Sequence, residues 1–323
     1  MTRVTGFLQR QMLPVGLVLA AVVGLVWPEP GRAMGRLPTQ YVAVSIIFVC
    51  AGLLLRTDEI RAALSAWRAT AWGSLSILFV TPAAGALIAF RTPLEPAYQI
   101  GLALFCCMPT TLSSGIALTS QARGNVALAL LLTVTTNLAG VFTIPFVLVA
   151  VLGAMGQVEL SATDLLGKLC LSILVPLAAG RWLRRPLGSW ADANRARITA
   201  LSNLALISIP WMKFSESSES LAAVAMGGLL MLILAGLVIH GVYLAINDAS
   251  TRLLGLDGPA RKAVVLMASQ KTLPVALTVL ALIPDEAVGP GVKGLLAIPC
   301  ITSHLGQIFV DAFIATRWGR LRE

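Results

Sequence analysis

The sequence is poor in charged residues, which make up only 12% of its 323 residues. Soluble domains carry about 25% charged residues, whereas 57% of this chain is hydrophobic. A soluble fold of this composition could not cover its own surface with polar groups. No long loop or low-complexity segment divides the chain, so we expect no soluble domain beside the apolar part.

Several kinds of chemistry lack the residues that they need. The chain has two histidines and five cysteines, and the cysteines lie inside apolar segments. Neither a zinc spacing nor a disulfide framework is visible. A His-Glu-x-x-His pair, a nucleophile elbow and an aspartate-rich motif at membrane depth are also missing. We therefore expect no enzyme and no organic cofactor, while the identity of any bound metal stays unknown.

Long apolar runs dominate what is present. A helix needs roughly 20 apolar residues to cross the hydrocarbon layer, and its backbone groups must be paired within the protein. The alternation typical of membrane strands is absent. The sequence predicts an all-α polytopic membrane protein with ten transmembrane helices, near 12–27, 38–56, 68–90, 97–122, 124–152, 163–182, 196–212, 220–247, 262–283 and 291–316.

The net charge of +9 would suit nucleic-acid binding, but its distribution argues for topology. Most of the 24 Lys and Arg residues fall at the two ends and in the even-numbered loops. This is the positive-inside bias of a protein with both termini in the cytoplasm. We expect a multi-pass protein of the cytoplasmic membrane, with the lipid bilayer as its environment and no nucleic-acid partner; a homo-oligomer is left open.

Two polar, proline-containing breaks interrupt the apolar pattern, at 108–115 and 269–274. Dividing the chain into halves of five spans, 1–157 and 158–323, puts each break in the fourth span of its half. Matching breaks in two halves of opposite orientation are typical of inverted-repeat transporters, whose binding site lies near the membrane midplane. Two unrelated proline kinks are the simpler interpretation.

Lys271 lies in the second break, at mid-span, while every acidic residue falls in a loop or near a span end. The deepest of these, Asp311, is expected toward the cytoplasmic end of its span. A lone cation at this depth costs roughly 3 kcal/mol, which favours a functional role. Lys271 could pair with an anionic substrate, lose its proton, or replace a bound metal ion. It could also snorkel or cap the carbonyls of the unwound chain.

Other polar residues lie near the breaks. The half-helices that begin near Ser113 and Thr272 point their N-termini at the membrane centre, which favours an anion, while the carbonyls that precede them favour a cation. The fifth span carries polar residues on one face, the tenth has a polar cluster, and His240 is interpreted as a packing residue. Interhelical hydrogen bonds would also explain these side chains, which are Asn125, Thr133, Asn137, Ser303, His304 and Gln307.

The stretch Pro109–Asn125 (PTTLSSGIALTSQARGN) resembles the broken fourth helix of the bile acid/sodium symporter family. The segments 269–272 and 303–307 resemble a divergent ten-helix, symporter-like branch of it. The resemblance implies a panel domain of helices 1, 2, 6 and 7 and a core domain of helices 3–5 and 8–10. It also implies that the crossing of broken helices 4 and 9 binds sodium beside the substrate cavity.

Carried over to this chain, the resemblance implies cation-binding positions at Ser113, Ser114, Thr133 and Gln270. Ala129 stands where the sodium-coupled members have a serine, and Lys271 stands where they have an acidic residue. An ammonium in that position weakens a cation site by Coulomb repulsion. The substrate-binding positions that we expect at the crossover are Thr110, Thr111, Asn137, Lys271, Thr272, Ser303 and His304.

We therefore expect a secondary active transporter that moves a small or amphipathic organic anion by alternating access. By the family resemblance, its coupling ion is sodium. One alternative is a proton-coupled or uncoupled exchanger of the same fold, with Lys271 as a built-in cation. A second is a non-transporting membrane regulator of ion homeostasis.

Overall fold

The computed structural model describes residues 15–54, 66–111, 114–153, 161–216, 218–219, 226–289 and 292–320. Over these ranges the chain is helical and contains no strand, as the all-α expectation requires. Contacts divide the chain into two compact units. Unit 1 comprises Met1–Leu55, Thr163–Val224 and Leu277–Ala297, and unit 2 comprises Arg56–Ala162, Ala225–Ala276 and Ile298–Glu323. The repeats 1–157 and 158–323, and the panel and core domains, stay predictions.

The helices have the length and composition of a multi-pass membrane protein. Within the described ranges, six are long and apolar enough to cross a membrane, or seven if Val15–Val26 and Pro28–Gly35 (α2), bent by 100°, form one span. Thr39–Leu54 (α3) and Pro96–Cys106 (α7) are apolar but shorter. The predicted number of ten spans stays a prediction. The six long helices are Trp67–Ala89, Val126–Gly153, Ala162–Ala193, Gly227–Leu253, Gly258–Leu282 and Val292–Arg320.

Unit 1 is held together by a close crossing of two helices. A Cβ atom on Gly52 of α3 would lie 2.8 Å from the backbone nitrogen of Arg181, and one on Gly180 would lie 2.9 Å from the carbonyl carbon of Val49. The two backbones therefore touch, as small residues allow in membrane helices. Besides Val15–Val26, α2 and α3, the described helices that contribute to the unit include Ala162–Leu169 (α10), the π-helix Cys170–Leu174 (η2), Val175–Ala193 (α11), Arg195–Glu216 (α12) and Asp285–Val288 (α17).

Helix α11 extends further than the sequence predicts. The sixth span was expected to end near residue 182, but the helix continues to Ala193. Its Arg184 reaches the carbonyl of Leu53 and also pairs with Asp192 at 2.9 Å. The apolar run stops where the charged residues begin. Because Arg184 and Asp192 find their partners on the surface of the helix, the helix continues past the end of the apolar run.

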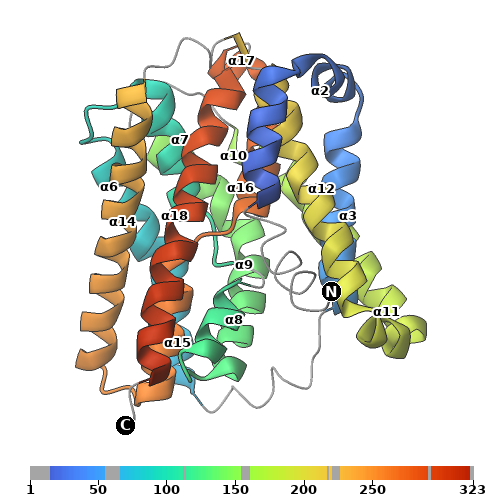
Figure 1. Cartoon of the computed structure of the whole chain (residues 1–323). Helices are drawn as coiled ribbons and strands as arrows, with labels where there is room; N and C mark the ends of the chain where they lie inside the picture. Colours follow the sequence, from blue (N-terminus) through green and yellow to red (C-terminus); the bar gives the residue numbers. More distant parts are fainter. Residues whose placement is uncertain are drawn as a thin grey trace. The chain divides into compact units, whose positions relative to one another are not determined.

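Unit 2 contains both predicted breaks (Figure 1). The first separates α7 from Ser114–Gln121 (α8). The second is the extended segment Gln270–Thr272 between Gly258–Ser269 (α15) and Leu273–Leu282 (α16). The other helices that contribute to this unit are Trp67–Leu75 (α5), the π-helix Ser76–Val80 (η1), Thr81–Ala89 (α6), Val126–Gly153 (α9), Met226–Leu253 (α14) and Val292–Arg320 (α18).

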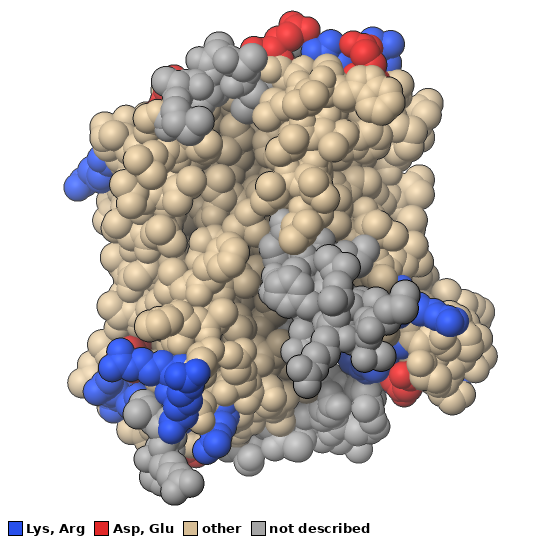
Figure 2. Space-filling view, in the orientation of Figure 1, with Lys and Arg blue, Asp and Glu red and all other residues tan. Residues whose placement is uncertain are grey.

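Two helices of unit 2 have their polar faces inside and their apolar faces outside. On α14, Leu230, Leu234 and Val238 are more than half exposed at a spacing of four residues, whereas His240 and Asn247 are buried. Phe309 and Phe313 are likewise exposed on α18. Figure 2 shows this uncharged surface above basic side chains at the lower left, where α14 and α18 end in Arg252, Arg317 and Arg320. A helix in contact with lipid needs this arrangement, with apolar side chains on its outer face and polar side chains inside the protein.

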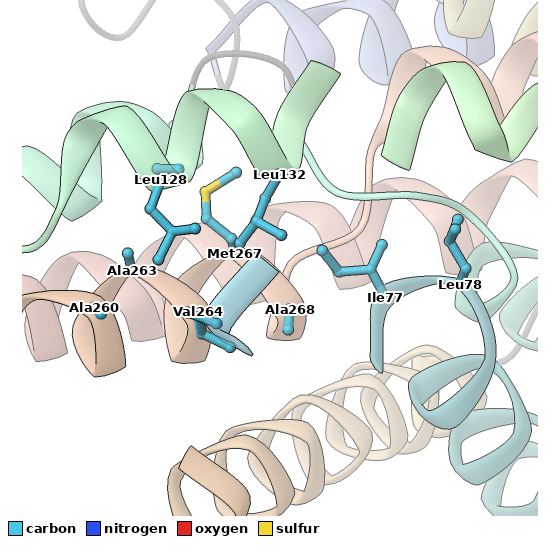
Figure 3. Close-up of a cluster of buried hydrophobic side chains, with 11 residues drawn as sticks. Ile77, Leu78, Leu128, Leu132, Ala260, Ala263, Val264, Met267 and Ala268 are labelled. Carbon is cyan, nitrogen blue, oxygen red and sulfur yellow. The ribbon is translucent and has the colours of Figure 1, made fainter. Parts of the chain in front are cut away.

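Helix α15 is buried against η1 and α9 through a cluster of apolar side chains. Figure 3 shows Met267 of α15 directed toward Leu128 and Leu132 of α9, with Ile77 and Leu78 of η1 at one end of the cluster. Small residues such as Ala263 let the helices approach closely. The side chain of Asp257 caps the start of α15 by accepting a 2.7 Å hydrogen bond from the nitrogen of Ala260. This packing fixes the helix end that leads into the second break.

A tight turn joins α8 to α9. Arg123 has a left-handed φ of 57°, and the nitrogen of Gly124 donates to the carbonyl of Thr119 at 2.8 Å, as in a Schellman motif. Asn125 then caps α9, because its Oδ1 accepts from the nitrogen of Leu128 at 2.9 Å. The sequence did not predict this capping role of Asn125, and of the three polar residues expected on one face only Thr133 and Asn137 bond to the first break.

Candidate functional site

The first break begins where α7 ends, and it is held by the second. The nitrogen of Thr272 donates to the carbonyl of Pro109 at 2.9 Å. The hydroxyl of Thr110 donates to the carbonyl of Met267, which is one of the free carbonyls at the end of α15. Both breaks thus satisfy each other's backbone groups, which is how non-helical chain survives at membrane depth.

The second break is also fixed by α18. The backbone nitrogen of Lys271 donates to Oε1 of Gln307 at 2.9 Å, and Nε2 of Gln307 donates to the carbonyl of Lys271 at 2.7 Å. His304 lies beside this pair, with its Nδ1 3.0 Å from Nε2 of Gln307 and 3.4 Å from the same carbonyl. The polar cluster of the tenth span therefore holds the backbone of the break.

Most of the expected cation-binding residues come together on one side of the crossing. Oε1 of Gln270 lies 3.0 Å from Oγ1 of Thr111 and 3.5 Å from Oγ of Ser114. Oγ1 of Thr133 lies 3.4 Å from the carbonyl oxygen of Thr111. These atoms are uncharged oxygens, the ligands that unwound transporter helices offer to a sodium ion. Ser113 lies outside the described residues.

Asn137 completes this oxygen cluster. Its Nδ2 donates to the carbonyls of Thr110 at 3.0 Å and Thr133 at 2.8 Å. Its Oδ1 is buried and has no hydrogen-bond partner within the described part of the chain. A buried acceptor without a donor costs free energy, and a cation would satisfy it. We refer to Thr111, Ser114, Thr133, Asn137 and Gln270 as the oxygen cluster.

The side chain of Lys271 points away from the two hydrogen bonds that its backbone makes with Gln307. It is 1% exposed, and its Nζ donates to the carbonyl of Ile77 at 2.8 Å. It also lies 5.7 Å from the ring centre of Tyr243, within the range of a cation–π contact. Of the four interpretations drawn from the sequence, this geometry matches a lysine that caps the carbonyl of an irregular helix.

The carbonyl of Ile77 is available because η1 is a π-helix and because Pro82, five residues further on, has no N–H to donate to it. In such a turn one extra residue disrupts the regular pairing, and π-turns are frequent at functional sites. Thr81 donates its hydroxyl to the carbonyl of Ser76 at 2.8 Å, while Lys271 takes that of Ile77. No carboxylate forms an ion pair with Lys271 among the residues that the structure describes.

One carboxylate does reach the second break, and the sequence did not predict it. Asp311 is fully buried, and its Oδ2 accepts from Nε2 of Gln270 at 2.6 Å. Its Oδ1 lies 2.8 Å from Nε2 of His240, whose Nδ1 lies 3.1 Å from the carbonyl of Ser269. Asp311 was expected near a span end and His240 as a packing residue. A helical projection of α18 would have shown that Asp311 faces the second break, since residues 304, 307 and 311 lie on one face of the helix.

The remaining expected substrate residues lie at or near a small cavity in the described part of unit 2. Thr272 and His304 are buried, and the hydroxyl of Thr272 and Nε2 of His304 have no partner among the described residues. A cavity beside Lys271 offers about 10 Å³, which is room for about one water molecule. Ser303 and Gln307 line it. That these residues contact a substrate stays a prediction.

Metal ligands of the usual acidic or soft kind are not grouped here. In the described ranges, no three His, Cys, Asp or Glu side chains converge as they would around a metal ion. The oxygen cluster offers uncharged ligands, which suit a weakly bound alkali cation rather than a resident transition metal.

The apolar helices and the two interlocked breaks define a class of protein, a multi-pass membrane transporter. Comparison with known proteins identifies the family: residues 11–320 match the SBF-like CPA transporter family, and the chain belongs to it. The predicted resemblance to the bile acid/sodium symporter family is thereby confirmed. Members of this family are transporters rather than enzymes.

Three relatives illustrate the similarity. The probable sodium/metabolite cotransporter BASS4, chloroplastic, of Arabidopsis thaliana is 37% identical over 97% of this chain and 74% of its own length. The putative symporter YfeH of Escherichia coli is 27% identical over 87% of this chain and 84% of its own. The sodium/bile acid cotransporter 7-A of Xenopus laevis is 24% identical over 95% of this chain and 91% of its own length.

Proposed function

We propose that the protein is a sodium-coupled secondary transporter that moves a small or amphipathic organic anion by alternating access. The observation that carries this proposal is the oxygen cluster at the crossing of the two breaks, with the unpartnered Oδ1 of Asn137 in it. Relatives named as sodium/metabolite and sodium/bile acid cotransporters support sodium as the coupling ion and a small organic molecule as the substrate.

In this proposal the cation binds at the oxygen cluster, through Ser113, Ser114, Thr133 and Gln270. Thr111 and Asn137 lie in the same cluster, so they contact both the cation and the substrate. The substrate is bound by Thr110, Thr111, Asn137, Lys271, Thr272, Ser303 and His304, and the half-helix N-termini at α8 and α16 attract its negative charge. The chain crosses the cytoplasmic membrane ten times as two inverted repeats, with both termini in the cytoplasm. The positive-inside bias of its Lys and Arg residues supports this orientation.

A specific observation favours a second candidate. The side-chain nitrogen of Lys271 is fixed between the carbonyl of Ile77 and the ring of Tyr243, so in its protonated form it supplies a positive charge beside the second break. A protein with such a built-in cation needs one bound cation fewer. The second candidate is therefore a proton-coupled or uncoupled exchanger of the same substrate class.

Thermal stability of the purified protein in detergent distinguishes the two candidates. Sodium chloride is titrated against potassium chloride at constant ionic strength. A ligand that binds only the folded state stabilises it by RT ln(1 + [L]/Kd), or about 2.7 kcal/mol at 100 times Kd. A rise in melting temperature specific for sodium supports sodium coupling. Equal curves in both salts overturn it and favour the exchanger.

A further inference from the structure

The hydrogen bonds around Asp311 link a buried charged group to the oxygen cluster. From them we infer that Asp311, paired with His240, is a positioning residue that fixes the side-chain amide of Gln270 so that its oxygen faces the cation site. The inference rests on the proposed cation site. It assigns to α14 and α18 a part in cation binding, although neither helix contributes a residue to the oxygen cluster.

The orientation of the Gln270 amide is decided by one partner. On one side Oε1 lies 3.0 Å from the hydroxyl of Thr111. A hydroxyl can donate or accept, so it would tolerate either end of the amide. On the other side Nε2 lies 2.6 Å from Oδ2 of Asp311. An ionised carboxylate only accepts, so it requires the NH2 group and turns the oxygen toward the cluster.

The hydrogen-bond partners of His240 indicate where its protons lie and what net charge His240 and Asp311 carry together. Nδ1 of His240 faces the carbonyl of Ser269 at 3.1 Å, and a carbonyl only accepts, so Nδ1 carries a proton. Nε2 faces Oδ1 of Asp311 at 2.8 Å, where two bare lone pairs would repel, so one further proton lies between these two atoms. The pair is then neutral as a whole, which explains how both side chains remain buried.

The charged and titratable groups near this pair come from several elements. Lys271 is in the second break, Tyr243 follows on α14, Cys106 ends α7, and His304 lies one turn before Gln307 on α18. Of these, Lys271, Tyr243 and Cys106 line the same small cavity as His240. None is hydrogen-bonded to Asp311 in the described part of the chain, where its bonds go to His240 and Gln270.

In ion sites the residues that bind the ion are commonly hydrogen-bonded to a second residue that does not touch it. Losing this second residue typically lowers the affinity for the ion by about 10–100-fold. Asp311 is suited to this role because it is rigid: it is fully buried and both of its oxygens are engaged. Without it, the Gln270 amide can rotate and present NH2 to the cation. The oxygen cluster would then lose a ligand and gain a repelling dipole.

The test compares two substitutions at one position. Asp311→Leu removes the acceptor, so half-saturation of the sodium-specific rise in melting temperature should require at least tenfold more sodium. Asp311→Asn can donate its NH2 to Nε2 of neutral His240 and accept from Gln270 with its oxygen, so it should restore most of the response. Thr302→Val on α18 is the control and should respond like the wild type, because among the described residues its hydroxyl bonds only its own helix.

An unchanged response in Asp311→Leu, or an equal loss in Asp311→Asn and Asp311→Leu, overturns the inference. If the wild type shows no sodium response, the proposed function fails, and a sodium-free double-mutant cycle still decides the positioning role. Asp311→Leu should then lower the melting temperature by several degrees more in the wild-type background than in a Gln270→Leu background. Additive shifts would show that Asp311 does not hold Gln270.

Discussion

Gln307 and Lys271 are joined by two hydrogen bonds that together imitate the pairing of two strands. The side-chain amide of Gln307 accepts from the nitrogen of Lys271 at 2.9 Å and donates to its carbonyl at 2.7 Å. A segment without helical hydrogen bonds thereby obtains both backbone partners from one side chain. The lysine side chain is left free to turn toward η1.

Replacing Gln307 with leucine should therefore destabilise the protein strongly. Two buried backbone groups would lose their partners, at about 1–3 kcal/mol each. The measurement is the melting temperature in detergent. Gln121→Leu is the matched control, because the side chain of this exposed glutamine bonds only the hydroxyl of Thr316 within the described ranges. Equal melting temperatures for the two variants would mean that the break does not depend on Gln307.

Lys271→Met should lower substrate uptake at least about tenfold, since even about 1.4 kcal/mol of lost anion attraction has that effect. The side chain keeps its length, so the variant should remain folded. The measurement is uptake into liposomes, from a panel of radiolabelled carboxylates and bile acids, under a sodium gradient. Lys168→Met, which removes an exposed lysine in α10, is the control. Wild-type uptake by Lys271→Met would remove the ammonium from the mechanism.

Thr133→Val should weaken the sodium-specific stabilisation while changing the shape of the side chain little. Its hydroxyl lies 2.9 Å from the carbonyl of Ala129 and 3.4 Å from that of Thr111, so it is part of the oxygen cluster. The expected change is a rise of about tenfold in the sodium concentration at half-saturation, for roughly 1.4 kcal/mol of lost ligation.

Thr135→Val tests whether this effect is local. Its hydroxyl also bonds its own helix, to the carbonyl of Leu131 at 2.7 Å, but takes no part in the oxygen cluster. The sodium titration of this variant should match the wild type. A similar weakening in both variants would indicate a general effect of removing a hydroxyl from α9.

Gly85→Ala should disturb the contact between Tyr243 and Lys271. A Cβ atom at this position would lie 2.5 Å from Sγ of Cys106 and closer still to the hydroxyl oxygen of Tyr243. The tyrosine ring must therefore move, and we expect a lower melting temperature. Gly241→Ala is the control, because its Cβ would meet nothing within 4 Å. That variant should be neutral or stabilised by up to about 1 kcal/mol through helix propensity.

Much of the fold could be predicted because membrane helices and their breaks leave local signals. Apolar length located the helices, and proline next to hydroxyl and amide groups located the breaks at Pro109 and Gln270. Helix ends were less predictable. The end of α11 was placed too early because a hydropathy window detects the loss of apolar residues, and Arg184 and Asp192 form their ion pair on a helix that continues.

The site was only half predictable, because its decisive pairs are distant in sequence. Gln270 and Asp311 are 41 residues apart, and His240 and Asp311 are 71 apart. Depth along a span is a one-dimensional measure, and it assigned Asp311 to a helix end. Its burial depends on which face of α18 meets α15, and only the packing of the helices decides that. The role of Asn125 as a cap was missed for a similar reason, since it depends on where α9 begins.

The π-turn at Ser76–Val80 has an evolutionary consequence. A π-turn contains one residue more than an α-helix of the same rise, so it behaves as an insertion that leaves both flanks in place. Removing that residue would not pair the carbonyl of Ile77, because Pro82 would then stand four residues after it and a proline has no N–H. The carbonyl thus depends on a partner from outside its own helix, which here is the ammonium of Lys271. We expect relatives without a lysine at position 271 to carry a residue with a backbone N–H at position 82.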